Sequence, residues 1–291
     1  MKNPLISIII PVFNSEKTLN NCLNSVLNQN YKNYEIIVID NNSTDGTKKI
    51  IDEFQNKNKR IRYLFEEKKG RGSARNTGIR KAKGKIIAMI DSDCIASQDW
   101  IKKITQKIRD GKEKAVMGFE EDFIGNYWTK NIQNANLNFI QNHLKKGYTA
   151  SLDSKNFAIE SKLMKELMFD ENLGNLEDYD LALRMREYVK VKFLIEIKVK
   201  HLHKNSFFKW AKLQFNRAYW NAQIYKKHKK NINFKDEIMM KDFSIKNNLG
   251  TILLLIKIFT TKNDNHKLFL VISAISWKLG LIWGVIKSPN S

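Results

Sequence analysis

Residues 5–12 have the sequence LISIIIPV, a continuous aliphatic run of the kind that a strand buried on both faces requires. A similar run returns as EIIVID at residues 35–40, and further runs follow at residues 61–65 and 85–91. Apolar residues at helical spacing separate these runs, at residues 15–29, 44–56 and 73–83. Strands that alternate with helices of this length predict an α/β fold with a mostly parallel central sheet and right-handed crossovers.

The rest of the chain is less periodic, but further elements are expected. The predicted segments are a strand at 115–119, a helix at 129–146, a helix at 176–188, a strand at 191–199 and a long amphipathic helix at 207–230. We expect one α/β domain over residues 1–230, divided into two halves at about residue 95. Residues 231–291 are expected to form a basic, apolar, helical region that associates with a membrane.

Charge divides the chain into a nearly neutral part and a strongly basic part. The 291 residues carry 51 Lys and Arg against 30 Asp and Glu, a net charge of +21, and residues 181–291 alone contribute +16. This excess argues against a typical acidic cytosolic enzyme and favours a polyanionic partner, either nucleic acid or anionic lipid. Lysines that simply coat a solvated surface are the alternative. Two cysteines, Cys22 and Cys94, exclude a disulfide framework and fit a reducing compartment.

Two apolar stretches lie near the C-terminus, at residues 249–259 and 268–286. The second is interrupted only by Lys278 and contains Trp277 and Trp283. A charge near the middle disfavours a spanning helix, whereas tryptophans at headgroup level and lysines at the rim suit an interfacial or re-entrant helix. The alternative is a helix pair that packs on the catalytic domain. The basic residues beside these stretches shift the weight from nucleic acid to an anionic membrane at its cytoplasmic face.

Two acids, Asp91 and Asp93, follow the apolar run KIIAMI directly. In an open parallel sheet, ligands bind beyond the carboxyl ends of the strands, so both carboxylates are expected at the binding edge. Their oxygens could converge on one hard cation such as Mg²⁺ or Mn²⁺. A turn acid that caps the following helix is the alternative.

Three further segments are candidates for the site. GRGSARNTG at residues 70–78 fits neither the dinucleotide nor the P-loop pattern, but it places two arginines beside a helix N-terminus, where anionic phosphate binds. EDYD at residues 177–180 holds more acids than capping requires, so one carboxylate is a candidate general base. His201 and His203 would point to the same side of a strand and are candidate metal or phosphate ligands, or an ordinary surface pair.

Five motifs occur in an order that resembles a known family. They are SIIIPVFN at residues 7–14, EIIVIDNNSTDGT at 35–47, GRGSARNTGI at 70–79, DSDC at 91–94 and EDYDLALRM at 177–185. The set resembles the family 2 glycosyltransferases, which are inverting enzymes with a GT-A fold that use nucleotide-sugar donors. The resemblance covers residues 5–220. It implies a catalytic domain over residues 1–230, with a nucleotide half at about 1–95 and an acceptor half at about 96–230.

The resemblance implies a role for each matched residue. Asp178 corresponds to the catalytic base, with Glu177 beside it on the substrate side. Asp93 corresponds to the metal ligand, with His203 or His201 as a second ligand, and the implied cofactor is Mg²⁺ or Mn²⁺. The residues implied for binding the donor base, its phosphates and its sugar are Pro11, Asp40, Asn41, Arg71, Arg75, Asn76, Asp91 and Asn156. The family often has a second Asp in place of Asn41, so uracil recognition is less firmly implied.

The predicted function is transfer of a sugar from a nucleotide-diphosphate donor, most simply a UDP-sugar, to an acceptor hydroxyl. The acceptor would be a glycan or lipid-linked acceptor in cell-surface polysaccharide synthesis. A nucleic-acid-binding protein is disfavoured because no helix-turn-helix, zinc-finger or RNP-like motif is present. A non-catalytic membrane scaffold would not need Asp91, Asp93 and Asp178, and a nucleotidyltransferase would not explain the acidic helix at residue 177.

Overall fold

The computed structural model describes residues 3–122, 125–142, 144–202, 206–228 and 267–287. The chain divides into two compact units, of which the first is Met1–Gly125 with Gln133–His203 and the second is Asn126–Ile132 with Lys204–Ser291. This division differs from the expected boundary at residue 230. Helix α9 (Phe207–His228) groups with the C-terminal helix α12 (Lys267–Ile286), not with the sheet.

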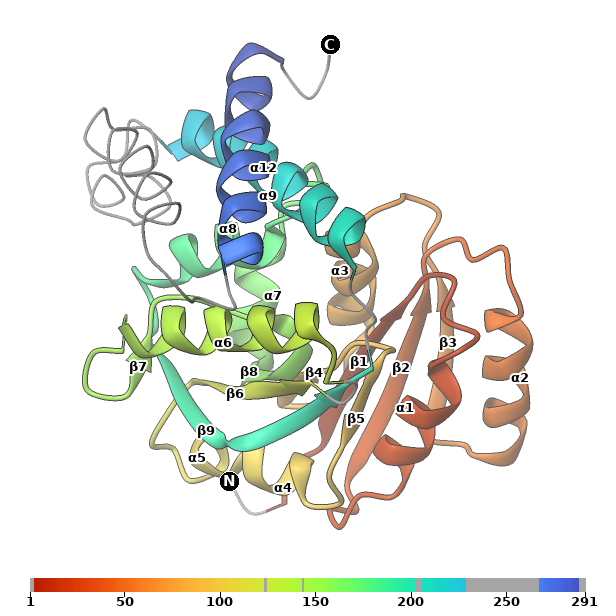
Figure 1. Cartoon of the computed structure of the whole chain (residues 1–291). Helices are drawn as coiled ribbons and strands as arrows, with labels where there is room; N and C mark the ends of the chain where they lie inside the picture. The colour runs from red at the N-terminus through yellow and green to blue at the C-terminus, as the bar shows by residue number, and fades with distance from the viewer. Residues whose placement is uncertain (1–2, 123–124, 143, 203–205, 229–266, 288–291) are drawn as a thin grey trace. The chain divides into compact units, whose positions relative to one another are not determined.

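Four parallel strands form the first half of the sheet (Figure 1). The strand β1 (Ile6–Val12) pairs with β2 (Tyr34–Asp40) on one side and with β4 (Ile86–Met89) on the other, and β3 (Ile61–Phe65) pairs with β2. All four residues of β4 are buried, as are six of the seven in β1. Both faces of the sheet are covered, which is why these strands are continuous apolar runs. The prediction of these four strands is confirmed.

Helices α1 (Leu19–Leu27), α2 (Thr47–Lys57) and α3 (Arg71–Lys81) connect the parallel strands. Alternate residues of β1 enter different cores. Ile8 and Ile10 pack with α1 on one face, and Ile9 packs with α3 on the other. Gly78 lets α3 approach closely, because a Cβ there would lie 2.7 Å from Ile39 Cδ1 and 2.9 Å from Ile9 Cγ2.

The second half of the sheet is mixed, which corrects the expectation of a mostly parallel sheet. The strand β8 (Phe157–Glu160) runs antiparallel to both β4 and β6 (Ala115–Asp122), while β6 runs parallel to β9 (Val191–His201). The short strands β5 (Cys94–Ala96) and β7 (Tyr148–Thr149) run antiparallel to β9. Among the described residues the strand order is β3-β2-β1-β4-β8-β6-β9-β5. The strands β5, β7 and β8 are two to four residues long, which is too short to show a hydrophobic pattern of their own, so the sequence did not predict them.

Short helices complete the first unit. They are α4 (Trp100–Ile104), α5 (Gln106–Arg109), the 3-10 turn η1 (Ser154–Asn156), α7 (Ser161–Leu167) and α8 (Glu177–Met185). Helix α6 (Tyr127–Asn142) contributes residues 127–132 to the second unit and 133–142 to the first. The helices predicted at 129–146 and 176–188 are therefore found with shorter or shifted ends.

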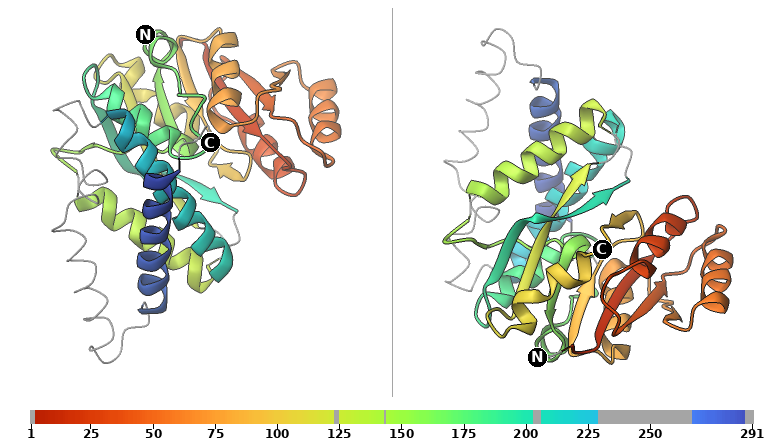
Figure 2. Two further views of the ribbon diagram at one scale, coloured as in Figure 1. Left: turned by 90° about the horizontal axis from the view of Figure 1, so that it is seen from above. Right: turned by 90° about the horizontal axis from the view of Figure 1, so that it is seen from below.

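The second unit is built around close packing of α9 against α12, which run beside each other in both views of Figure 2. A Cβ on Gly280 would lie 2.2 Å from the carbonyl oxygen of Phe215, and one on Gly284 would lie 2.6 Å from that of Tyr219. Two glycines one helical turn apart thus let the two backbones meet. Within the described residues, no helix combines the length and the hydropathy needed to cross a membrane. The apolar stretch 249–259 lies outside the described residues.

Candidate active site

A cavity of about 780 Å³ lies at the carboxyl ends of the parallel strands. Most of its wall comes from residues 11–18 at the end of β1 and beyond it, from residues between 69 and 75 around the start of α3, and from residues 91–93 after β4. This is the edge at which an open α/β sheet binds its ligands. Six predicted site residues line the cavity, namely Pro11, Asn41, Arg71, Arg75, Asp91 and Asp93.

The side chain of Asn41 hydrogen-bonds to the loop that leads to Gly70. Its amide nitrogen donates to the carbonyls of Glu66 and Lys68 at 3.0 and 2.8 Å, and its oxygen accepts from the backbone nitrogen of Gly70 at 2.8 Å. An aspartate could not donate to those two carbonyls, so an amide suits this position. Asp40 is buried next to it and accepts from the backbone of Ser43 at 3.0 Å. Both side chains therefore use polar atoms to shape the cavity wall.

The glycine loop leads directly into α3. Gly70 has a φ of 143°, a conformation that side chains with a Cβ rarely adopt, and Arg71 begins the helix. The hydroxyl of Ser73 donates to the carbonyl of Gly70 at 2.8 Å and tightens the turn. Cationic side chains of Lys17, Lys69 and Arg71 line the same cavity, so this wall can meet an anionic diphosphate.

Arg75 joins the two acidic motifs. Its guanidinium is 2% exposed and lies 3.0 Å from Asp91 Oδ1 and 2.7 Å from Glu177 Oε1, with Asp178 Oδ1 at 3.8 Å. The carboxylates hold the pKa of Arg75 above its ordinary value even though burial opposes the charge. The residue lines the cavity, yet both terminal nitrogens face protein carboxylates. Arg75 thus ties the strand end at Asp91 to the helix that carries Asp178.

Five predicted site residues do not line the cavity, namely Asp40, Asn76, Asn156, Glu177 and Asp178, and the amides of Asn76 and Asn156 bond to other parts of the protein. The amide of Asn76 bonds to the backbone oxygen and nitrogen of Phe169 at 3.0 and 2.9 Å. Asn156 is 1% exposed, accepts from Trp100 Nε1 and donates to the carbonyls of Phe119 and Ile197. Each amide has structural partners that occupy its polar atoms, and the structure places neither among the residues that line the cavity.

The DSD turn and the end of β9 form a candidate site for a metal ion. His201 Nε2 is 3.1 Å from Asp93 Oδ2, because β9 pairs with β5 in a register that sets His201 opposite Cys94. Adjacent ligands of an octahedral Mg²⁺ or Mn²⁺ ion, each about 2.1 Å from the metal, lie about 3.0 Å apart, so this pair fits such an ion. His203, the other predicted histidine, lies outside the described residues. The structure thus supplies His201 as the partner of Asp93.

The carboxylates around His201 set the pKa values of this pair, and a cation bound at Nε2 would replace the proton there. Burial would raise the pKa of Asp93, but the hydrogen bond from His201 and the charge of Lys155 hold it below its usual range. Burial would lower the pKa of His201, but Asp93 and Glu120 raise it to about 9. Cys94 also lies near. Burial and the charges of Asp93 and Asp91 raise the pKa of its thiol well above the ordinary value, so it stays protonated and is a poor ligand for a hard ion.

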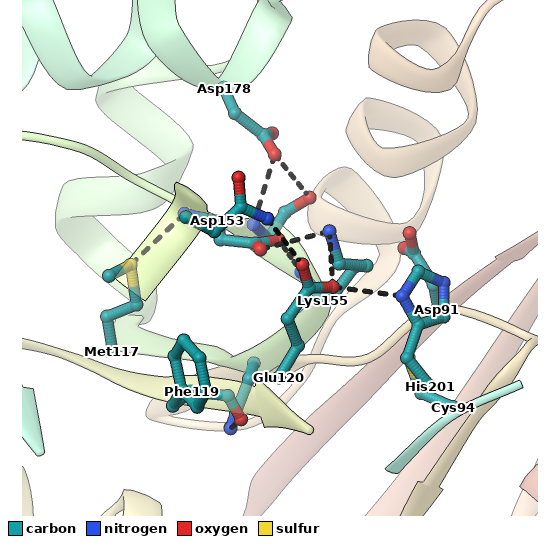
Figure 3. A network of polar contacts seen from close by, with 12 residues as sticks. Asp91, Cys94, Met117, Phe119, Glu120, Asp153, Lys155, Asp178 and His201 are labelled. Carbon is teal, nitrogen blue, oxygen red and sulfur yellow. Dashed lines mark hydrogen bonds and ion pairs between the residues drawn. The ribbon is translucent and has the colours of Figure 1, made fainter. Parts of the chain in front are cut away.

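A buried polar network extends from His201, and sequence patterns did not reveal it (Figure 3). Glu120 Oε2 is 2.9 Å from His201 Nδ1 and 3.0 Å from Lys155 Nζ, and Lys155 Nζ is also 3.0 Å from Asp153 Oδ2. A glutamate in an apolar strand and a lysine beside Asn156 were the only signals available. Neither identifies a site until the strands are paired.

Asp178 lies in the first turn of α8 with one oxygen engaged and one free of hydrogen bonds. Its Oδ2 accepts from the backbone nitrogen and the hydroxyl of Ser154, at 3.1 and 3.0 Å. Its Oδ1 is buried and accepts no hydrogen bond from the residues that the structure describes. Burial and the charges of Glu177 and Asp153 raise the pKa of Asp178 to about 7, although Arg75 and Ser154 oppose the shift. A carboxylate with this pKa and a free oxygen can accept a proton near neutral pH.

Solved structures with similar folds bind nucleotide sugars. The mannosyltransferase PcManGT of Pyrobaculum calidifontis, in complex with GDP-Man and Mn²⁺, superimposes with a TM-score of 0.72 at 17% identity over 99% of this chain and 87% of that one. TarS of S. aureus, in complex with UDP-GlcNAc, superimposes with a TM-score of 0.58 at 15% identity over 95% and 90% of the two chains. These likenesses show a GT-A glycosyltransferase fold.

Sequence comparison identifies the family. Residues 7–168 match the model of glycosyl transferase family 2. An uncharacterized glycosyltransferase of Haemophilus influenzae is 31% identical over 235 residues, which are 79% of this chain and 91% of that relative. Glycosyltransferase GlyG of Streptococcus pneumoniae is 32% identical over 165 residues, and the match spans about half of its length, 49%. The chain belongs to glycosyltransferase family 2.

Proposed function

We propose that the protein transfers a sugar from a nucleoside-diphosphate donor to an acceptor hydroxyl with inversion at the anomeric carbon. The observation that carries this proposal is the state of Asp178. The carboxyl group of Asp178 has a pKa of about 7, and its Oδ1 accepts no hydrogen bond from the described residues. Arg75 links Asp178 to the cavity wall at Asp91. A single base on one side of the sugar, with diphosphate-binding groups on the other, is the arrangement that direct displacement needs.

In this reaction Asp178 Oδ1 removes the proton from the acceptor hydroxyl as that oxygen attacks the anomeric carbon. Ser154 holds Oδ2 with two hydrogen bonds and so keeps the carboxylate in one orientation. Arg75 stabilises the ionised form of Asp178 from 3.8 Å. The anomeric carbon–oxygen bond breaks at the same time, and the leaving diphosphate carries away the bonding electron pair.

The leaving group is bound at the other side of the cavity. Lys17, Lys69 and Arg71 offer positive charge to the diphosphate there. Asp93 and His201 would hold a divalent cation, Mg²⁺ or Mn²⁺, which neutralises charge that builds on the diphosphate. Asp91 faces Arg75 and supports the ribose or sugar side.

The proposed donor is a UDP-sugar, and the acceptor is a glycan or a lipid-linked glycan in cell-surface polysaccharide synthesis. The similar folds of TarS with UDP-GlcNAc and of PcManGT with GDP-Man support a nucleotide-sugar donor of this class. The amide nitrogen of Asn41 donates to two backbone carbonyls. We therefore assign recognition of the base to Pro11, Phe13 and the backbone around them, which line the cavity.

We also propose that the second unit attaches the enzyme to the cytoplasmic face of an anionic membrane. Helix α12 exposes Ile275, Leu279, Ile282 and Ile286 at helical spacing, which places them along one side of the helix. An exposed apolar stripe beside basic residues favours an interfacial position on a lipid surface.

A thermal-shift screen tests the donor assignment. The purified full chain is heated with UDP-GlcNAc, UDP-glucose and GDP-mannose, each with Mn²⁺ or with EDTA. A donor that binds the folded protein raises the melting temperature by mass action, and we expect at least one UDP-sugar to do so only when Mn²⁺ is present. A shift with GDP-mannose alone would overturn the UDP assignment. Equal shifts with Mn²⁺ and with EDTA would overturn the metal role.

A further inference from the structure

Glu120 is a buried carboxylate that no step of the proposed reaction uses. Its side chain lies on β6, is nearly inaccessible to solvent and accepts from three donors. These are His201 Nδ1 at 2.9 Å, Lys155 Nζ at 3.0 Å and Asn136 Nδ2 at 2.9 Å. Burying a carboxylate costs free energy. A buried carboxylate with three donors around it is therefore expected to have a role that depends on its charge and its position.

The use follows from the two nitrogens of the imidazole. Nδ1 of His201 faces Glu120, so the ring can present only Nε2 to the DSD turn, where Asp93 Oδ2 lies at 3.1 Å. When Nδ1 donates to a carboxylate, the lone pair for a metal is on Nε2, and the carboxylate also raises the basicity of the ring. Glu120 therefore determines both the tautomer and the orientation that metal ligation requires.

Lys155 holds Glu120 in this position. Its Nζ bridges Glu120 Oε2 and Asp153 Oδ2, each at 3.0 Å. The preceding residue, Ser154, donates twice to Asp178. One short segment, residues 153–155, thus contacts the proposed base through Ser154 and the ligand-orienting carboxylate through Lys155 (Figure 3).

We propose that Glu120 and Lys155 are positioning residues for the divalent cation: Glu120 orients His201 toward Asp93, and Lys155 fixes Glu120. This inference rests on the proposed metal role of Asp93 and His201. It adds that the affinity for the cation depends on two residues that do not touch it.

The test measures Mn²⁺ binding to the full-length protein by electron paramagnetic resonance, without donor or acceptor. Glu120→Gln removes the charge and keeps the shape, and we expect the dissociation constant for Mn²⁺ to rise about 10- to 100-fold. The matched control is Glu121→Gln, the next residue on β6, which pairs with Lys198 at the surface. We expect it to bind Mn²⁺ as the wild type does. Lys155→Met should weaken binding in the same direction as Glu120→Gln.

A spectroscopic readout separates orientation from general damage. The electron spin echo of bound Mn²⁺ should show modulation from an imidazole nitrogen in the wild type and in Glu121→Gln, and should lose it in Glu120→Gln and in His201→Ala. If Glu120→Gln does not fold, the charge-balanced pair Glu120→Leu with Lys155→Met is measured instead, because removing both partners of a buried ion pair costs less than removing one.

The outcomes distinguish this inference from the function on which it rests. If Asp93→Asn abolishes Mn²⁺ binding while Glu120→Gln keeps wild-type affinity and nitrogen modulation, the metal site stands and the positioning role is overturned. If the wild type binds no Mn²⁺, or if Asp93→Asn binds it as well as the wild type does, the proposed metal role fails and the positioning role fails with it.

Discussion

Asp178 is held in a state that suits proton transfer but works against folding. Its carboxylate is desolvated beside Glu177 and Asp153, and Arg75 compensates only in part. Oδ1 is buried and has no hydrogen-bond donor among the described residues, so an acceptor hydroxyl that reaches it would supply the missing hydrogen bond. A charged group that is left short of partners commonly marks a catalytic position rather than a stabilising one.

Replacing this residue tests its role directly. Asp178→Asn keeps the shape and removes the basic oxygen, so we expect kcat to fall by about 100-fold or more, the usual contribution of a general base. Binding of the donor nucleotide should be unchanged, because Asp178 does not line the cavity. The exposed Asp52 on α2 offers a control, since Asp52→Asn should transfer sugar normally. Wild-type turnover by Asp178→Asn would remove the residue from the mechanism.

The pH dependence of both rate and stability follows from the same carboxyl group. Because burial raises its pKa to about 7 from an ordinary value of 3.8, kcat should rise with pH through about 7 as the base ionises. Between these two values the folded protein binds more protons than the unfolded chain, so the free energy of unfolding should fall as pH rises. Denaturant titrations from pH 4.5 to 8 measure this slope, which should be shallower in Asp178→Asn. An identical slope in both proteins would contradict the assigned pKa.

At the scale of elements, the pairing of α9 and α12 depends on two glycines. Glycine weakens a helix, yet Gly280 and Gly284 occupy one face of α12 where the backbone of α9 leaves no room for a Cβ. Ala218 and Ala222 lie opposite them on α9, so small residues meet small residues across the interface. At these two positions the close approach of the helix backbones outweighs the low helix propensity of glycine.

Gly280→Ala puts these two effects in opposition. Alanine gains about 1 kcal/mol of helix propensity, but its Cβ would lie 2.2 Å from the carbonyl oxygen of Phe215, and overpacking costs about 1–3 kcal/mol. Because the contact is with backbone rather than a flexible side chain, we expect net destabilisation, measured by chemical denaturation followed by tryptophan fluorescence. Ile282→Ala, at an exposed position of the same helix, should have a much smaller effect. A more stable Gly280→Ala protein would show that the helices can separate without cost.

At the scale of the whole molecule, charge and apolar exposure coincide in the C-terminal part of the chain. Residues 181–291 contribute +16 of the net charge of +21. The exposed stripe of α12 belongs to the same part of the chain. Lysines near an anionic surface each add about 1 kcal/mol of attraction, and buried apolar side chains add to it.

Membrane attachment is therefore expected to need both contributions. The full chain should sediment with vesicles that contain phosphatidylglycerol, should remain largely in the supernatant with pure phosphatidylcholine, and should be partly released by 0.5 M NaCl. The triple change Ile275→Ser, Leu279→Ser and Ile282→Ser should abolish sedimentation while leaving donor binding intact. Wild-type protein that stays in the supernatant with anionic vesicles at low salt would end the membrane proposal.

The parallel half of the sheet, and the edge at which the candidate site lies, could be predicted from the amino-acid pattern alone. The runs at residues 5–12 and 85–91 are apolar throughout because both faces of their strands are buried, and that signal is local. Once parallel strands are predicted, Asp91 and Asp93 must lie at the carboxyl edge. The order of the five motifs was sufficient to indicate the family that the comparisons show.

Which side chains meet at that edge depends on how distant segments pair in the folded protein. His201 lies beside Asp93 because β9 pairs with β5 in one register, and Glu120 reaches His201 because β6 pairs with β9. Arg75, predicted to contact phosphate, lines the cavity and also joins Asp91 to Glu177, and Asn156 is buried and accepts a hydrogen bond from Trp100. Local pattern reports burial and backbone preference, whereas these contacts join residues 16 to 108 positions apart and depend on strand register and packing, which no single segment encodes.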